Sequence, residues 1–219
     1  LATPEHQWVV QASHGHFIRV PTTKLRGRTI PRTVARRPEQ NGEFYEGVRH
    51  GFTFGDGCVY NAGRQARAVF FGKKDQVMLA YFGGLRCKPY LDKKTGSYLL
   101  HGLPAHYKKL PEPGASASYW YGFVCGFLAA DGTVDTYGCA LLTQKSKETL
   151  EKVAEQLPRI GMVAGPIRRQ DHTSKFTRAN GKVETYQGET HFVTLLKQFM
   201  QPCDFLIEQH RINFLAKRL

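Results

Sequence analysis

The sequence predicts an α+β fold made of two similar halves that follow one another along the chain. The first observation is a pattern that occurs twice, as VRHGFTFGDG at residues 48–57 and as FVCGFLAADG at residues 123–132. The second is that each copy precedes the same order of expected elements: two strands, a helix and two more strands. We therefore expect two αββαββα halves, at residues 41–115 and 116–219, after a short β-rich segment at residues 1–40.

Each copy of the pattern is expected to form an apolar helix with a face of small residues. Spaced four residues apart, they are Gly47, Gly51 and Gly55 in the first copy and Gly122, Gly126 and Ala130 in the second. Because glycine within a helix costs about 1 kcal/mol relative to alanine, such a row indicates that another backbone comes close. Each helix is the best partner for the other, so we expect the two to pack side by side.

Both patterns end in an Asp-Gly pair. We expect Gly57 and Gly132 to take the left-handed conformation that ends many helices, which would place Asp56 and Asp131 side by side. Two carboxylates at the negative ends of two helices repel each other unless a cation lies between them, and oxygen ligands suit Mg²⁺. The alternative is a glycine-rich helix pair whose Asp-Gly turns have no chemical role.

The remaining elements are expected in the same order in both halves. In the first half, hairpins at 58–71 and 86–101 flank a helix at 73–85, and a linker rich in proline and glycine follows at 110–116. Ser116 or Ser118 is suited to cap the next helix. In the second half, we expect strands within 132–143, a helix that begins at Ser146, a hairpin at 166–193 with a polar tip at 168–175, and a final helix at 203–219.

The chain is strongly basic, with 31 lysine and arginine residues, 18 acidic residues and a net charge of +13. A basic protein of this size usually binds a polyanion, and nucleic acid is the leading candidate. We expect no membrane partner, because no apolar run has the length of a spanning helix, and no signal peptide begins the chain. The five cysteines form no C-x-x-C pair, which favours a reducing, intracellular location such as the cytoplasm of a bacterium, an archaeon or a phage host.

The segment between residues 19 and 37 carries basic residues and no acid. Its basic residues are Arg19, Lys24, Arg26, Arg28, Arg32, Arg36 and Arg37. We interpret the segment as an arm that follows DNA phosphates, with Arg26, Arg28, Arg32 and Arg36 as its contacts. The alternative is a solvated linker.

The repeated pattern resembles the LAGLIDADG motif of homing endonucleases in its two-copy form, and the resemblance extends over roughly residues 41–219. It implies that two pseudo-symmetric halves form a saddle of antiparallel sheets around two central LAGLIDADG helices. It also implies that one monomer cuts both strands of double-stranded DNA at a long, asymmetric site, with Mg²⁺ or another divalent cation such as Mn²⁺ or Ca²⁺. The polar face of such a sheet fits the major groove, where base edges can be distinguished.

The resemblance also assigns residues to the expected site. Asp56 and Asp131 would bind the metal together with the neighbouring positions Gly55 and Ala130, and two metal ions can clamp the attacking and leaving oxygens. The family places a basic or amide residue of each half near the scissile phosphates. Our candidates are Lys88 and Gln144.

The residues expected to contact DNA lie on strands and turns, where side chains alternate between the core and the solvent. In the first half they are Arg64, Gln65, Arg67, Lys88, Tyr90, Lys93 and Lys94. In the second half they are Thr136, Tyr137, Arg168, Arg169, Gln170, Lys175, Arg178, Lys182 and Gln187. Each could equally be an ordinary solvated strand residue, but the basic excess of the set favours DNA.

Two other functions remain open. LAGLIDADG relatives include maturases and transcription regulators that bind DNA or RNA without cutting, although regulators commonly lose one or both acids that this sequence retains. The segments TPEH at 3–6 and KLRGRTI at 24–30 resemble part of an intein splicing (Hint) domain, in which Thr3 and His6 would assist the first acyl shift. The terminal nucleophiles of splicing are missing, so we expect an intein-encoded nuclease and no splicing by this chain alone.

Overall fold

The computed structural model describes residues 3–11, 17–26, 35–177 and 183–217, which form two compact units, residues 1–34 and 35–219. The smaller unit contains short strands, as predicted: β1 (Gln7–Gln11) and β2 (Phe17–Pro21), which pair antiparallel. The 3₁₀ helix η2 (Thr22–Lys24) follows. The Thr22 hydroxyl donates a hydrogen bond to the carbonyl of Thr3 at 2.7 Å. Residues 35–40, which the sequence analysis grouped with this segment, belong to the larger unit.

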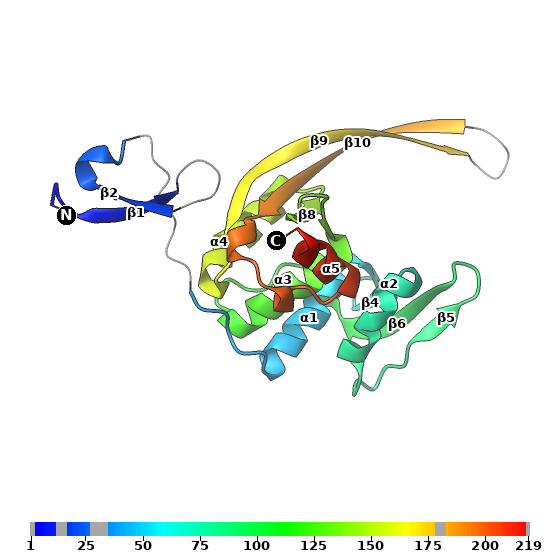
Figure 1. The fold of residues 1–219 in the computed structure, drawn as a ribbon. Coiled ribbons are helices and arrows are strands. Elements are labelled where there is room, and N and C mark those ends of the chain that lie inside the picture. The colour runs from blue at the N-terminus through cyan, green and yellow to red at the C-terminus, as the bar shows by residue number, and fades with distance from the viewer. Residues whose placement is uncertain (1–2, 12–16, 27–34, 178–182, 218–219) are drawn as a thin grey trace. The chain divides into compact units, whose positions relative to one another are not determined.

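The larger unit contains the two predicted halves (Figure 1). The first consists of α1 (Gly42–Gly55), β3 (Gly57–Tyr60), β4 (Gln65–Phe70), α2 (Gly72–Gln76), η3 (Val77–Phe82), β5 (Tyr90–Asp92), β6 (Ser97–Pro104) and η4 (Ala105–Lys108). The second consists of α3 (Ala117–Asp131), β7 (Gly132–Val134), β8 (Ala140–Gln144), α4 (Lys147–Gln156), η5 (Leu157–Ile160), β9 (Ala164–Thr177), β10 (Val183–Leu195), η6 (Lys197–Phe199), η7 (Pro202–Asp204) and α5 (Glu208–Ala216). Each half has one antiparallel sheet, in the order β3-β4-β6-β5 or β7-β8-β10-β9. Of the two halves, the second ends in an α-helix and the first in a short 3₁₀ turn.

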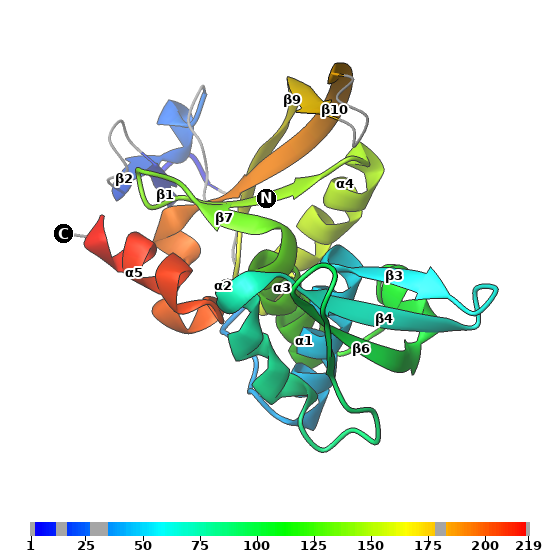
Figure 2. The same ribbon diagram turned by 90° about the vertical axis from the view of Figure 1, so that its right-hand side faces the viewer.

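The helices α1 and α3 pack against each other between the two sheets (Figure 2). Their small residues permit this contact, as predicted. A Cβ atom on Gly51 would overlap the carbonyl oxygen of Phe123 and lie 2.8 Å from the backbone nitrogen of Phe127, and one on Gly126 would lie 2.9 Å from the nitrogen of Phe52. These neighbours are backbone atoms, which cannot rotate away.

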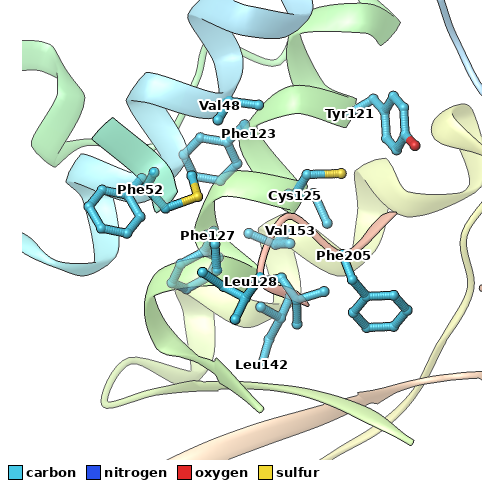
Figure 3. Packing of buried hydrophobic residues seen from close by; sticks show 14 of the residues in the cluster. Val48, Phe52, Tyr121, Phe123, Cys125, Phe127, Leu128, Leu142, Val153 and Phe205 are labelled. Carbon is cyan, nitrogen blue, oxygen red and sulfur yellow. The ribbon is translucent and has the colours of Figure 1, made fainter. Parts of the chain in front are cut away.

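The core fills the space between this helix pair and one face of each sheet. In β4, Ala66, Ala68 and Phe70 are buried and alternate with half-buried residues, as expected for a sheet with one face packed on helices. Figure 3 shows side chains gathered around α3, including Phe123 and Leu128 from α3 itself. Burying such side chains is the main source of stability for the unit.

Three predicted elements differ in extent. The helix expected at 73–85 is a single α turn that continues as the 3₁₀ helix η3, which buries Met78 and Phe82. The polar tip expected at 168–175 lies instead within β9, because a run of polar residues can form a strand that extends beyond the core. The final helix is shorter than expected and begins at Glu208, after the 3₁₀ turn η7.

The predicted left-handed ends of α1 and α3 are wrong. Gly132 is extended, with φ −94° and ψ 162°, and Gly57 is the first residue of β3 and has no positive φ. Both positions need glycine because of close neighbouring atoms, not because of an unusual backbone conformation. A Cβ atom on Gly57 would lie 2.6 Å from the carbonyl oxygen of Arg67, and one on Gly132 would lie 2.8 Å from the Cα of Leu128.

A buried ion pair fixes the segment before α1 to the second half. The Nε and Nη2 atoms of Arg37 donate to the two carboxylate oxygens of Asp204 at 2.8 and 2.6 Å, and the carboxyl of Asp204 has no exposed surface. Nη1 donates to the carbonyl of Ile160 at 3.1 Å. The Arg37 guanidinium is thus bound by partners inside the protein and is not part of the basic arm. Along the part of the chain that the structure describes, no helix is long and apolar enough to span a membrane.

Candidate active site

The two acids of the repeated pattern lie together where α1 and α3 end. Asp56 is the residue that follows α1, and Asp131 is the last residue of α3. The helices are so close here that a Cβ atom on Gly55 would lie 2.6 Å from the Cβ of Ala130 and 3.1 Å from Oδ2 of Asp131. The small residues before each acid therefore bring the two carboxylates to one place.

Burial makes the charged form of both acids unfavourable, and the charge of Asp131 adds to this effect at Asp56. Burial, followed by the charges of Asp131 and Asp75, raises the pKa of Asp56 to about 7. Burial also raises the pKa of Asp131, while Lys108 and Lys74 act in the opposite direction. Buried carboxylates with raised pKa values are typical of functional sites.

Lys108, in η4, is a basic residue that the sequence analysis missed. Its Nζ donates to the carbonyls of Thr53 at 3.2 Å and Gly55 at 3.4 Å, and also to that of Phe54. These are carbonyls at the end of α1 that lack helical partners, where a cation is favourable. Burial lowers the pKa of Lys108, and the charges of Asp131 and Asp56 counter this effect. The ammonium is therefore held at the helix end beside both acids.

Lys74, in α2, is a second cation near the acids. Its charge lowers the pKa of both Asp56 and Asp131. Its Nζ lies 3.6 Å from Oδ1 of Asp75, a carboxyl that is 2% exposed and whose Oδ2 accepts from the backbone N–H of Phe71 at 2.8 Å. Asp75 thus closes the first turn of α2, and its other carboxylate oxygen pairs with the Lys74 ammonium.

Gln144 and Lys88, the residues that the sequence predicts near the scissile phosphates, lie in different places. Gln144 ends β8, and its Nε2 donates to Oδ2 of Asp131 at 3.3 Å. Lys88 is exposed in the segment before β5. The first-half basic residues that the structure brings to the acids are Lys108 and Lys74. Lys108 is hard to find in the sequence, because η4 is a short turn with no periodic pattern.

The residues present fit a hard divalent cation. Two carboxylates and the carbonyl oxygens of Gly55 and Ala130 are oxygen donors of the kind that Mg²⁺, Mn²⁺ and Ca²⁺ take in proteins, and water completes their coordination. Within the described ranges, no group of three or more His, Cys, Asp or Glu side chains forms a metal cluster.

The first-half sheet presents most of the predicted DNA contacts on its outer face or at its ends. Gln65 and Arg67 alternate with buried alanines in β4, and Nε of Arg67 donates to Sγ of Cys58 at 2.9 Å. Tyr90, in β5, is 50% exposed, and its hydroxyl lies 3.1 Å from Nε2 of His101. The remaining predicted contacts are exposed in turns, and they are Arg64, Lys93 and Lys94.

The second-half sheet separates its basic residues between two faces. Arg168 and Gln170 are exposed in β9 on the face opposite Ile167, which packs against the core. Arg169 lies on the same face as Ile167 and forms ion pairs with Asp171 at 2.9 Å and Glu189 at 3.1 Å. Of these three, Arg168 and Gln170 are oriented like the outer-face residues of β4.

The other predicted contacts lie in turns, on the far part of the hairpin or in the arm. Thr136 and Tyr137 are exposed in the turn between β7 and β8, and Arg26 and Arg36 are exposed in the arm. The backbones of Lys175 and Gln187 belong to β9 and β10. Outside the described residues lie Arg28, Arg32, Arg178 and Lys182.

Known proteins share this architecture. A family model described as LAGLIDADG-like domain matches residues 120–197, from the start of α3 to the start of η6. No curated protein sequence matches the chain.

Two kinds of solved structure are similar. The homing endonuclease I-DmoI in complex with DNA and Mn is 16% identical, with a TM-score of 0.43 over 81% of this chain and 97% of its own. Full-length DUF199/WhiA from Thermotoga maritima is 14% identical, with a TM-score of 0.50 over 82% of this chain and 61% of its own. The N-terminal LAGLIDADG domain of DUF199/WhiA is 12% identical, with a TM-score of 0.46 over 83% of this chain and 84% of its own.

Together with the family match, the likeness to full-length WhiA confirms the predicted fold class, an α+β arrangement of two four-stranded antiparallel sheets around a central helix pair.

Proposed function

We propose that the chain is a site-specific endonuclease that cuts both strands of double-stranded DNA with the help of a divalent cation. The observation that carries this proposal is the meeting of Asp56 and Asp131 at the ends of two closely packed helices, each with a raised pKa. A structural turn needs no such pair, because two buried like charges destabilise the fold. The net charge of +13 supports a DNA partner.

The residues around the acids have distinct roles in this proposal. Asp56 and Asp131, with the carbonyls of Gly55 and Ala130, would hold the cation. The cation supplies positive charge to the reacting phosphate and lowers the pKa of water. Lys108 and Lys74 would add positive charge at the phosphates and stabilise the charge that develops during hydrolysis. Gln144, hydrogen-bonded to Asp131, would orient that carboxylate and a nearby water.

The two halves would give one chain a complete active site. Each half contributes one acid, so a monomer suffices for both strands, and its two different sheets would read an asymmetric target. A DNA target inside cells agrees with an intracellular location. We also infer an intein origin for the smaller unit, because TPEH at 3–6 and KLRGRTI at 24–30 resemble part of a splicing domain.

Cleavage of a library of long, randomised duplex sites tests the proposal. The protein is incubated with the library and Mg²⁺, and cut ends are captured by adapter ligation and sequenced. We expect a single asymmetric consensus, no capture in EDTA, and none with Asp56→Asn. Enrichment of a sequence by binding, without any cut ends in Mg²⁺, Mn²⁺ or Ca²⁺, would overturn it in favour of a DNA-binding regulator.

A further inference from the structure

His50 lies in the middle of α1, one turn before the carbonyls that Lys108 contacts, and it is 1% exposed. Both ring nitrogens have partners. Nε2 is 2.8 Å from the carbonyl oxygen of Lys109, and Nδ1 is 2.8 Å from the hydroxyl of Tyr119. Because a carbonyl only accepts, Nε2 carries the hydrogen, and Nδ1 accepts from the tyrosine hydroxyl. The neutral imidazole therefore satisfies both of its polar atoms.

The same ring also holds the residue on the other side of Lys108. The ring of Tyr107 stacks on that of His50, with centroids 4.8 Å apart and planes at 10°. The hydroxyl of Tyr107 donates to Glu46, one turn earlier on α1. His50 thus contacts the residues immediately before and after Lys108, one by stacking and one by a hydrogen bond.

Lys108 itself reaches down the same helix. With its neighbours fixed by His50, its side chain extends to the carbonyls of Thr53 and Gly55 at the end of α1, beside Asp56. A backbone shift at η4 would move Nζ away from these carbonyls, because a short 3₁₀ turn has few hydrogen bonds of its own to fix its position. The position of this cation therefore depends on the contacts that the buried His50 ring makes with Tyr107 and Lys109.

We propose that His50 is a positioning residue that holds Lys108 beside the paired acids. The proposal rests on the proposed nuclease function, but the placement of Lys108 is a property of the free protein. It predicts that His50 affects DNA cleavage through Lys108 and not through general stability. Tyr107 and Tyr119 complete the support, since each contacts the imidazole directly.

The first experiment measures the accessibility of Lys108 without DNA. The full chain is labelled with an amine-reactive reagent, and the rate at Lys108 is followed by mass spectrometry. We expect His50→Leu to speed this labelling several-fold, and His50→Gln, whose amide can still donate to the Lys109 carbonyl, to remain close to the wild type. Val153→Ala, in the buried face of α4, is a control for lost stability and should leave the rate unchanged. An unchanged rate in His50→Leu overturns the proposal.

The second experiment measures single-turnover cleavage of the selected site with saturating protein. His50→Leu should slow cleavage by up to about 100-fold, as misplacement of a catalytic group can do, while DNA affinity stays within about twofold of the wild type. In a Lys108→Met background the same substitution should have no further effect, because there is no ammonium left to position. A slowing of equal size in both backgrounds would show a merely structural role and overturn the proposal. A wild-type chain that never cuts overturns the nuclease function but leaves the labelling result to decide the placement.

Discussion

At the scale of single residues, the paired acids carry an energetic cost that no structural role explains. Asp56 has a pKa raised to about 7, so its charged form is disfavoured in the folded protein near neutral pH. Lys108 and Lys74 reduce this cost without removing it, since both acids keep raised pKa values. Strain of this kind is typical of functional sites, where it is relieved by a ligand.

Replacing Asp56 by asparagine should therefore stabilise the metal-free protein while it abolishes cleavage. A shift from 3.8 to about 7 would correspond to roughly 4 kcal/mol for a fully buried group, and solvent at the partly exposed carboxyl reduces this to about 1–2 kcal/mol. Thermal unfolding in EDTA at pH 8 should show a midpoint several degrees higher, with DNA affinity nearly unchanged. A lower midpoint, or cutting at the wild-type rate in Mg²⁺, contradicts this assignment.

His50 should make the protein less stable in acid. Burial is the main cause that lowers its pKa from 6.5 to about 4, so between these values the unfolded chain binds a proton that the folded chain does not. Stability then rises with pH across this window and falls as the pH drops from 7 to 5, by about 2 kcal/mol for this group. Urea unfolding of wild type and His50→Gln at both pH values isolates the contribution of His50 to stability. Carboxyls with raised pKa values act equally in both proteins and cancel in the comparison. An equal pH dependence in the two would contradict it.

At the scale of elements, the contact between α1 and α3 determines where the acids lie. Gly51→Ala places a Cβ atom against the backbone of Phe123 and Phe127, so the helices must separate. We expect a loss of about 3 kcal/mol, the upper end for an added methylene in a packed interior. Gly42→Ala is the control, because no atom lies within 4 Å of its Cβ position, and it should raise stability by roughly 0.5–1 kcal/mol. Urea unfolding compares them, and a neutral Gly51→Ala would refute the close contact.

Local patterns in the sequence identified the elements, and tertiary contacts decided what the patterns left open. The repeat located α1, α3 and both acids, because a row of small residues on a helix indicates close packing against another backbone. Lys108 was missed because its place depends on His50, which is distant in sequence. The sequence groups Arg37 with the arm, because its partner Asp204 is 167 residues away along the chain. The pattern predicts a polar hairpin tip at 168–175, which the structure places within β9, because these residues are all polar and give no apolar face.

At the scale of the whole chain, the two halves have similar orders of elements but differ in the length of their second hairpins. In the first half, β5 has 3 residues and β6 has 8, whereas β9 and β10 have 14 and 13. The strand β8 pairs with residues 191–195 alone, so the rest of the second hairpin extends beyond it (Figure 1). The halves are also unequal at the acids, since Lys108 and Lys74 come from the first and Gln144 from the second. Under the proposed function, these differences between the halves would suit a target whose two half-sites differ.

The basic arm within residues 19–37 should make DNA binding depend strongly on salt. If Arg26, Arg28, Arg32 and Arg36 lie along DNA phosphates, each contact releases condensed counterions, and log K falls with log salt by about 0.9 per phosphate. Replacing all four by alanine should weaken binding to every sequence and flatten the salt slope by up to about 3–4. Discrimination between the selected site and its mutants should change little, because phosphate contacts carry no sequence information.

A matched control comes from α4, where Lys147 and Lys152 pair with Glu151 and Glu148 at 2.8 and 2.7 Å. Replacing these lysines by alanine removes basic side chains that already have partners, so the salt slope should stay close to that of the wild type. Fluorescence anisotropy across a salt series measures all three proteins. An arm variant with the wild-type slope would show that the arm is a solvated linker, because a counterion term cannot persist once its phosphate contacts are gone.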